Sequence, residues 1–136
     1  AGKVDTQSMI IAADIFPTLA ALGGATVPRD AGIEGLDVSA VWQGAKQSPR
    51  GAVYWEYGRN EEFFKFPGNP QDRSPTLAVR RDQWKLLVNP DGSKAELYDL
   101  ADDPKEAHNL AAAQSARVQE LTRRVLAWRA TWPAAR

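Results

Sequence analysis

A change of hydrophobic period in the second half of the chain constrains the fold most. Between residues 76 and 100 the side chains alternate, with Leu77 and Val79 in one run and Trp84, Leu86 and Val88 in the next. This alternation is typical of strands that bury one face. Between 112 and 132 the apolar residues recur every three or four positions instead, which indicates an amphipathic helix. The sequence therefore predicts strands followed by a helix that covers their apolar face.

The strands are expected to form an antiparallel meander of about four members. Tight turns at 81–83 and at 89–92 separate three strands, the last of which begins at Glu96. Residues 51–58, rich in β-branched and aromatic side chains, predict the fourth strand. Trp128 and Trp132 lie on the apolar stripe of the helix, and we expect both to be buried. The fold class is α+β.

The first fifty residues predict a helix and a connector. Asp14 is expected to be the N-cap of a short apolar helix that ends at Gly23 and Gly24. Residues 26–50 form a connector with one helical turn at 38–43. We therefore expect one subdomain over 1–136, in which 1–25 holds the helix, 26–50 the connector, and 51–136 the sheet and terminal helix.

Composition excludes several classes of function. The chain has 136 residues, no cysteine, and 17 basic against 17 acidic side chains. Disulfides and thiolate chemistry are excluded, and no overall charge attracts nucleic acid or a membrane. No apolar run reaches the ~20 residues needed to span a bilayer. The start has neither a signal pattern nor an initiator methionine, which indicates that the chain is cut from a longer protein.

The acidic stretch at 96–110 allows two interpretations. Asp99, Asp102 and Asp103 could bind a hard cation such as calcium. Alternatively, Asp103, followed by a proline and by Glu106 three positions on, is typical of a helix start, and we favour this interpretation. His108 is the sole histidine, with no nucleophile near it in the sequence. We expect no catalytic residue and no metal ligand in this chain.

The region after the strand at 53–57 is the best candidate for a binding site. Glu56, Tyr57, Arg59 and Asn60 could line a polar pocket, because they open a long loop that runs to residue 75. Alternatively, the loop's phenylalanines pack it against a neighbouring domain. Nucleic acid is not an expected partner, since the tryptophans of the terminal helix should be buried rather than offered to bases.

Several motifs, in order, resemble the C-terminal portion of sulfatases, the alkaline-phosphatase-like sulfuric ester hydrolases. They are D-I-F-P-T-L at 14–19, G-L-D-V at 35–38, Y-W-E at 54–56, A-V-R at 78–80 with W-K-L at 84–86, and E-L-Y-D-L at 96–100 followed by Asp103, Pro104, Glu106, Asn109 and Leu110. The last motif is long and correctly spaced, so it is the most specific. Together the motifs span nearly the whole chain.

The resemblance implies that the reaction centre lies outside this chain. Family members carry a cysteine or serine that becomes formylglycine, and a divalent cation, usually calcium, both in the missing N-terminal domain. In the family this subdomain packs beside the large catalytic domain and its loops help to shape specificity, so Glu56 and Tyr57 are carried over as pocket-lining positions. The 59–75 insertion departs from the family pattern. The resemblance suggests a periplasmic or secreted parent.

Our hypothesis is a C-terminal sulfatase fragment that completes the fold and shapes the substrate cleft, and that is inactive alone. Its partners would be the N-terminal catalytic domain of the same polypeptide and a sulfated small molecule or glycan. In the family the helix over 14–23 belongs to the edge of the large domain. In this chain we therefore expect it to fold back, to pair with another copy of the chain, or to be mobile. The alternatives are a freestanding module that binds an anionic glycan or a protein through the 59–75 loop, and a purely structural domain.

Overall fold

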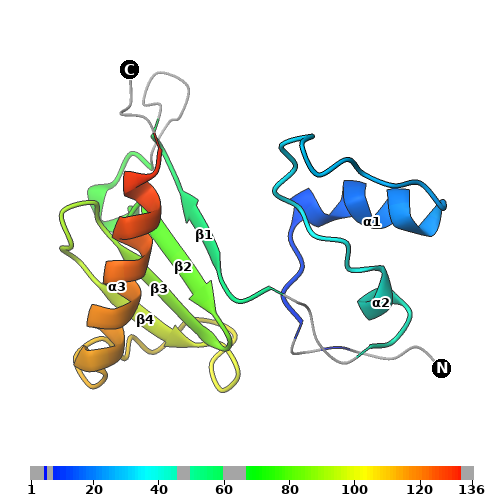
Figure 1. The fold of residues 1–136 in the computed structure, drawn as a ribbon. Coiled ribbons are helices and arrows are strands. Elements are labelled where there is room, and N and C mark those ends of the chain that lie inside the picture. The colour runs from blue at the N-terminus through cyan, green and yellow to red at the C-terminus, as the bar shows by residue number, and fades with distance from the viewer. Residues whose placement is uncertain (1–4, 6–7, 46–49, 60–66, 133–136) are drawn as a thin grey trace. The chain divides into compact units, whose positions relative to one another are not determined.

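The computed structural model describes residues 5, 8–45, 50–59 and 67–132. The chain forms two compact units, Ala1–Gly51 and Ala52–Arg136. The second unit contains a four-stranded antiparallel sheet and a terminal helix, and the first contains short helices (Figure 1). The predicted α+β class is therefore confirmed.

The sheet of the second unit is a simple meander. Its strands are β1 (Val53–Glu56), β2 (Leu77–Arg81), β3 (Trp84–Val88) and β4 (Glu96–Asp99), in the order β1-β2-β3-β4. Every neighbouring pair is antiparallel. The β2–β3 turn places Asp82 at a φ of 54°, a left-handed conformation that aspartate tolerates better than most residues. All four predicted strands are confirmed.

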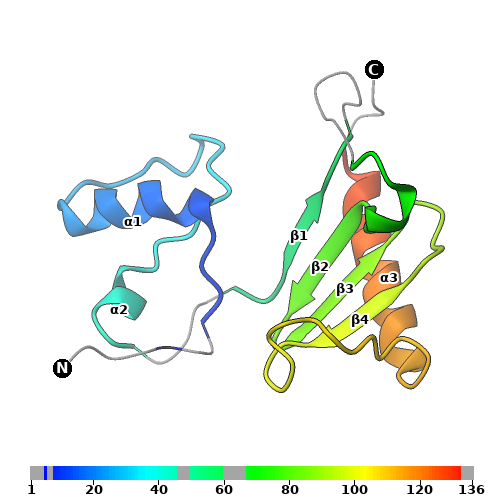
Figure 2. The ribbon, with the colours of Figure 1, turned by 180° about the vertical axis from the view of Figure 1, so that it is seen from behind.

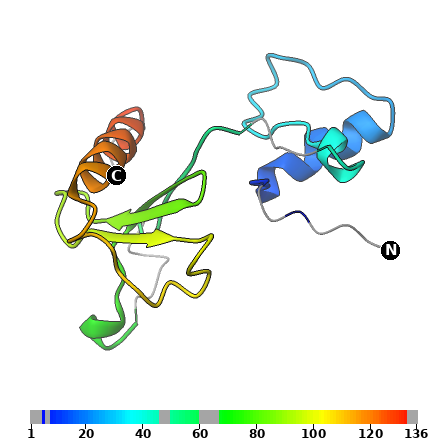
Figure 3. The same ribbon diagram turned by 90° about the horizontal axis from the view of Figure 1, so that it is seen from below.

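The terminal helix α3 (Ser115–Ala130) lies along one face of this sheet (Figures 1 and 3). Among the described residues, the core between them holds seven buried side chains: Leu77, Val79, Leu86, Val88, Leu97, Leu121 and Val125. The strand members occupy alternate positions, and the two helix members are four residues apart. The two periods seen in the sequence therefore meet at one interface, which is what fixes the register of each strand.

The two tryptophans at the end of α3 differ in burial. Trp128 is half-buried and stacks on Tyr54, with ring centroids 5.6 Å apart. Trp132 is 44% exposed, and its ring meets that of Trp128 in an edge-on pair with a centroid separation of 6.0 Å. The expectation that both are buried is therefore wrong for Trp132. The physical reason is that it lies beyond the last helical residue, Ala130, where the stripe no longer faces the sheet.

The first unit contains η1 (Ala12–Asp14), α1 (Ile15–Leu22) and α2 (Ser39–Trp42). The short helix predicted at 38–43 is confirmed as α2, and Gly24, just past α1, adopts a φ of 76° that ends the helix. Asp14 is the N-cap residue of α1, as predicted, but its carboxylate makes no cap bond to this helix. Asp14 instead accepts hydrogen bonds from the backbone N–H groups of Ile11 (2.9 Å) and Leu36 (2.8 Å).

Buried polar contacts join α1 to the connector. The carboxylate of Asp14 also pairs with the Arg50 guanidinium. One turn along, the Thr18 hydroxyl accepts a hydrogen bond from Val38 N–H at 3.0 Å, and Asp14 and Thr18 are both fully buried. Gly35 allows this close approach, because a Cβ there would lie 1.9 Å from the carbonyl oxygen of Ala13. The sulfatase-like D-x-x-P-T and G-L-D-V segments are thus hydrogen-bonded to each other.

No helix among the described residues combines the length and the apolar character that crossing a membrane requires.

Candidate functional site

The acidic stretch at 96–110 stabilises the edge of the sheet. The amide oxygen of Asn109 accepts hydrogen bonds from Leu97 N–H (3.1 Å) and Ala111 N–H (2.9 Å). Leu110 N–H then donates to the carbonyl of Leu97 at 2.8 Å. Both backbone groups on the outer edge of Leu97 in β4 are therefore satisfied, which closes an edge that would otherwise be exposed.

The acids of this stretch close a loop, so the predicted helix start at Asp103 is wrong. Residues 104–107 are not helical, and α3 begins only at Ser115. The Asp103 carboxylate accepts the backbone N–H of His108 at 2.8 Å, and this bond lowers the pKa of Asp103. Asp103 and Pro104 therefore form part of a turn, because the Asp103 carboxylate binds the N–H of His108, five residues on, and not an N–H in the first turn of a helix.

Further polar side chains of this stretch have partners as well. The Lys85 ammonium on β3 donates to both carboxylate oxygens of Glu106, each at 2.7 Å, and Glu106 itself has a φ of 56°. The Tyr98 hydroxyl donates to Glu96 at 3.0 Å, and burial together with that neighbouring carboxylate raises the pKa of Tyr98 to about 12. Within the described part of the chain, no three histidine or acidic residues gather as a cation would require.

Strand alternation places Glu56 on the helix-facing side of β1. Its side chain is 8% exposed and accepts a hydrogen bond from Arg129 Nε in the last turn of α3, at 2.9 Å. The second carboxylate oxygen lies 3.6 Å from Arg59 Nη1. Glu56 therefore links three segments, namely the end of β1, the end of α3 and the start of the 59–75 loop.

Tyr57 follows on the opposite side of the chain and lines a hollow. Its N–H donates to the carbonyl of Thr76 at 2.7 Å, which extends the β1–β2 pairing by one residue, and its side chain is 46% exposed. The hollow has a volume of about 230 Å³ and is lined by Tyr57, Pro67, Asp72, Arg73 and Ser74. We call it the Tyr57 hollow.

The structure brings Glu56 and Arg59 together, and it places Tyr57 in this separate hollow. The predicted site residue Asn60, like the loop's phenylalanines, lies outside the described residues. Sequence reasoning did not single out Asp72, Arg73 or Ser74. A signal for them was present in Asn69-Pro70, since Asn69 caps the short helix η2 (Pro70–Asp72) by accepting Gln71 N–H at 3.1 Å.

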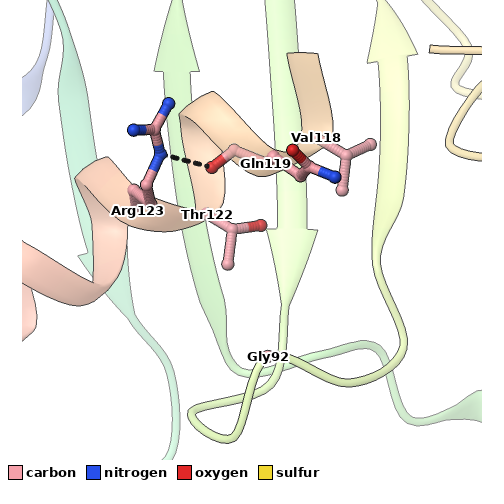
Figure 4. A pocket seen from close by; sticks show the side chains of 5 residues that line it. All are labelled: Gly92, Val118, Gln119, Thr122 and Arg123. Atoms are coloured by element: carbon pink, nitrogen blue, oxygen red, sulfur yellow. Dashed lines mark hydrogen bonds between the residues drawn. The ribbon is translucent and has the colours of Figure 1, made fainter. Parts of the chain in front are cut away.

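A second hollow, of about 560 Å³, lies between the β3–β4 turn and α3 (Figure 4). It is lined by Gly92 from the turn and by Val118, Gln119, Thr122 and Arg123 from the helix. Arg123 Nε donates to the backbone carbonyl of Gln119 at 3.4 Å. None of these lining residues lies in the motifs that carry the resemblance to sulfatases.

Comparison with known proteins identifies the family. The family of N-sulphoglucosamine sulphohydrolase C-terminal regions matches residues 1–130. Human arylsulfatase A is 29% identical over 126 residues, covering 77% of this chain and 23% of that protein. A putative sulfatase from Bacteroides thetaiotaomicron shares the fold with a TM-score of 0.58 at 28% identity, covering 83% of this chain and 23% of that one. A 2-O GAG sulfatase gives a TM-score of 0.60 at 26% identity, covering 87% and 24%.

The chain thus spans about a quarter of the length of each of these three proteins. The predicted resemblance is confirmed over nearly the whole sequence. In this chain, residues of the motifs that carry the resemblance join α1 to the connector and close the edge of β4. This chain belongs to the sulfatase C-terminal domains of the alkaline-phosphatase-like family.

Proposed function

We propose that the chain is the C-terminal part of a sulfuric ester hydrolase and is inactive without the rest of that enzyme. The observation that carries this proposal is the family match over 1–130, in a chain about a quarter as long as its relatives. The chain would supply one subdomain, comprising both units, that completes the fold. Its partners are the N-terminal catalytic domain of the same polypeptide and a sulfated substrate.

The cofactors implied by the family do not fit the residues of this chain. Formylglycine needs a cysteine or serine in a C/S-x-P-x-R motif, and the sequence contains neither a cysteine nor that motif. Among the acids considered as cation ligands, Asp99 already accepts the N–H of Ala101 and Asp103 that of His108. We assign both groups to the catalytic domain and no step of the reaction to residues described here.

The apolar face of α1 supports docking onto that domain. Ile15, Phe16, Leu19 and Leu22 are each 46–61% exposed. Covering a large apolar side chain contributes about 1.5–3 kcal/mol, so leaving four uncovered is costly. Isolated chains should therefore pair through α1, and Leu19→Asp should return them to monomers in sedimentation velocity. A wild-type chain that stays monomeric at high concentration would contradict this part of the proposal.

The end of β1 supports a role in shaping the substrate cleft. Glu56, Tyr57, Arg59 and Asn60 are the proposed lining positions, and the pairing of Glu56 with Arg129 and Arg59 orders the described end of β1. In the whole enzyme, Tyr57→Ala or Arg59→Ala should change the ratio of kcat/KM between two sulfated substrates more than it changes the melting temperature. If kinetics stay unchanged for both, these residues do not line the cleft.

Sulfate release from an aryl sulfate tests the proposal. The 136-residue chain alone should show no turnover with or without added calcium, whereas the longer protein that contains it should be active. Appreciable metal-dependent turnover by the chain alone would refute the assignment of the reaction centre to another domain. The negative control is the longer protein with its own C/S-x-P-x-R nucleophile replaced by alanine.

A freestanding glycan-binding module is the second candidate, and the Tyr57 hollow is the observation that favours it. The two candidate functions predict different affinities of the isolated chain for a sulfated glycan. An accessory domain should bind a sulfated glycan with a dissociation constant near 1 mM or weaker, which corresponds to only about −4 kcal/mol. Micromolar binding by the isolated chain would favour the module. A purely structural domain would show no binding at all.

A further inference from the structure

The second hollow, between the β3–β4 turn and α3, has one wall that hydrogen bonds hold in place, and we call it the Gly92 hollow. Figures 1 and 2 show this turn beside α3, at the end of the sheet away from the β2–β3 turn. Gly92 N–H donates to the carbonyl of Asn89, and Asn89 N–H to the carbonyl of Ser93, both at 2.9 Å. No described atom lies within 4 Å of the position that a Cβ on Gly92 would take, so a ligand can approach the backbone here.

The helix wall of the hollow carries polar groups that are not engaged elsewhere. Gln119, Thr122 and Arg123 lie on it, together with the half-buried Val118 (Figure 4). Among the described residues, neither the Thr122 hydroxyl nor the side-chain amide of Gln119 has a hydrogen-bond partner. In the same part of the chain Arg123 uses one donor, its Nε, on the Gln119 carbonyl of its own helix at 3.4 Å. The three side chains therefore keep hydrogen-bonding capacity for a ligand.

The distribution of charge along α3 singles out Arg123. The helix contains four arginines and one glutamate. Three of the arginines have a carboxylate or an aromatic ring beside them: Arg117 lies over the Trp84 ring at 4.3 Å, Arg124 Nε donates to Glu120 at 3.0 Å, and Arg129 Nε donates to Glu56 at 2.9 Å. Arg123 has neither kind of partner among the described residues. A guanidinium that lines a hollow without a counter-charge favours an anionic ligand.

The size and lining of the hollow favour a peptide over a free ion or a sugar. Its volume of about 560 Å³ falls in the range of ~300–1,000 Å³ that ligand pockets occupy, so a single ion would leave most of it empty. Its described lining includes no aromatic ring on which a sugar or a base would stack. Arg123 can bind an acidic side chain with two parallel bonds, and Gln119 and Thr122 can pair with the N–H and C=O groups of an extended backbone.

We propose that the Gly92 hollow is a docking site for an acidic segment of a protein partner, in which Arg123 binds a carboxylate and Gln119 and Thr122 bind the adjoining backbone. Charge complementarity carries the choice of partner. The acid of the turn, Asp91, does not oppose it, because its carboxylate accepts the N–H of Ser93 at 2.9 Å and Lys94 balances its charge. This role is independent of the sulfatase reaction and adds a partner outside the parent enzyme.

Titration of the isotope-labelled chain with a capped peptide of alternating alanine and glutamate tests the proposal. The amide signals of Gly92, Gln119, Thr122 and Arg123 should shift together, with a dissociation constant of about 0.1–1 mM. Arg123→Ala should weaken binding about tenfold, because it removes charge-assisted bonds, and Thr122→Val about fivefold, because it removes a neutral one. Arg123→Lys keeps the charge without the two parallel bonds and should bind between the wild type and Arg123→Ala. All three variants should keep the folded spectrum, since neither residue belongs to the buried core.

Arg124→Ala is the matched control, because Arg124 is the next residue of α3, is also exposed, and is not among the residues that line the hollow. It lowers the net charge by the same amount as Arg123→Ala and should bind the peptide as the wild type does. No shift at the four amide signals up to about 20 mM peptide, or equal losses for Arg123→Ala and Arg124→Ala, would overturn the docking site. Equally tight binding of the glutamine counterpart of the peptide, of acetate, or of inorganic phosphate would also overturn it.

Discussion

Replacing Asn109 by alanine should destabilise the second unit by removing the closure of its sheet edge. The variant leaves Leu97 N–H, on a strand residue that is fully buried, without its acceptor. An unsatisfied buried donor costs about 1–3 kcal/mol. The Ala111 N–H loses the same acceptor, but that bond is exposed and water can replace it. We therefore expect a loss of about 2 kcal/mol.

Urea unfolding followed by tryptophan fluorescence measures this loss, because four of the five tryptophans lie beyond residue 52. With a slope of about 2 kcal/mol per molar for a small domain, the midpoint should fall by about 1 M. Asn109→Asp keeps an acceptor and should lose less. Asn89→Ala, which removes only an exposed bond to the Ser93 hydroxyl at 2.9 Å, is the matched control. Equal shifts for Asn109→Ala and Asn89→Ala would refute the reasoning.

Three further perturbations test separate contacts. Gly35→Ala places a methyl group 1.9 Å from a backbone carbonyl oxygen, so it should lower the free energy of unfolding of the first unit by about 1–3 kcal/mol, as measured by thermal unfolding. Gly51→Ala is the control and should be tolerated, because no atom of the described residues lies within 4 Å of the added methyl group. Glu56→Gln removes the charge that holds Arg129, so a double-mutant cycle between these positions should give a coupling of about 1 kcal/mol, and no coupling would contradict the contact. Tyr98 should ionise near pH 12 in an ultraviolet titration, and this step should be absent in Tyr98→Phe. Because the folded pKa is raised, the stability that Tyr98 contributes is present below pH ~10 and is lost between pH ~10 and 12. Ionisation of Tyr98 that is complete by pH ~11 would contradict this.

The strands and the terminal helix could be predicted from the sequence because each has a period that only one secondary structure satisfies. Leu77, Val79, Leu86 and Val88 need the alternation of a strand, and Leu121 and Val125 need a helix. The register follows, since a slip of one residue would turn the buried set to solvent.

The hydrogen-bond partners of the acids could not be predicted in the same way. Asp14 and Asp103 both precede helix-like segments, and a local signal cannot distinguish a cap from an acceptor for a distant N–H. Asp14 binds the N–H of Leu36, which is 22 positions away, and Asp103 closes a loop. Such partners depend on tertiary contacts, which propensity does not encode.

The candidate site was predicted only in part for a similar reason. The sequence shows that Glu56 and Tyr57 point to opposite faces of the sheet, but it does not show which face α3 covers. Because α3 covers the face of Glu56, Glu56 binds Arg129 and Tyr57 lines a hollow on the other face. Arg73 joins that hollow from a turn sixteen positions on, through a bond to a backbone carbonyl that no side-chain pattern signals.

The most direct test of the central claim is sulfate release from an aryl sulfate by the longer protein with residues 52–136 present, deleted, or added back as a separate chain. We expect activity with the segment, none after deletion, and none from residues 1–136 alone, because the segment supports a reaction centre that it does not contain. Full activity after deletion, or turnover by the 136 residues alone, would contradict the account.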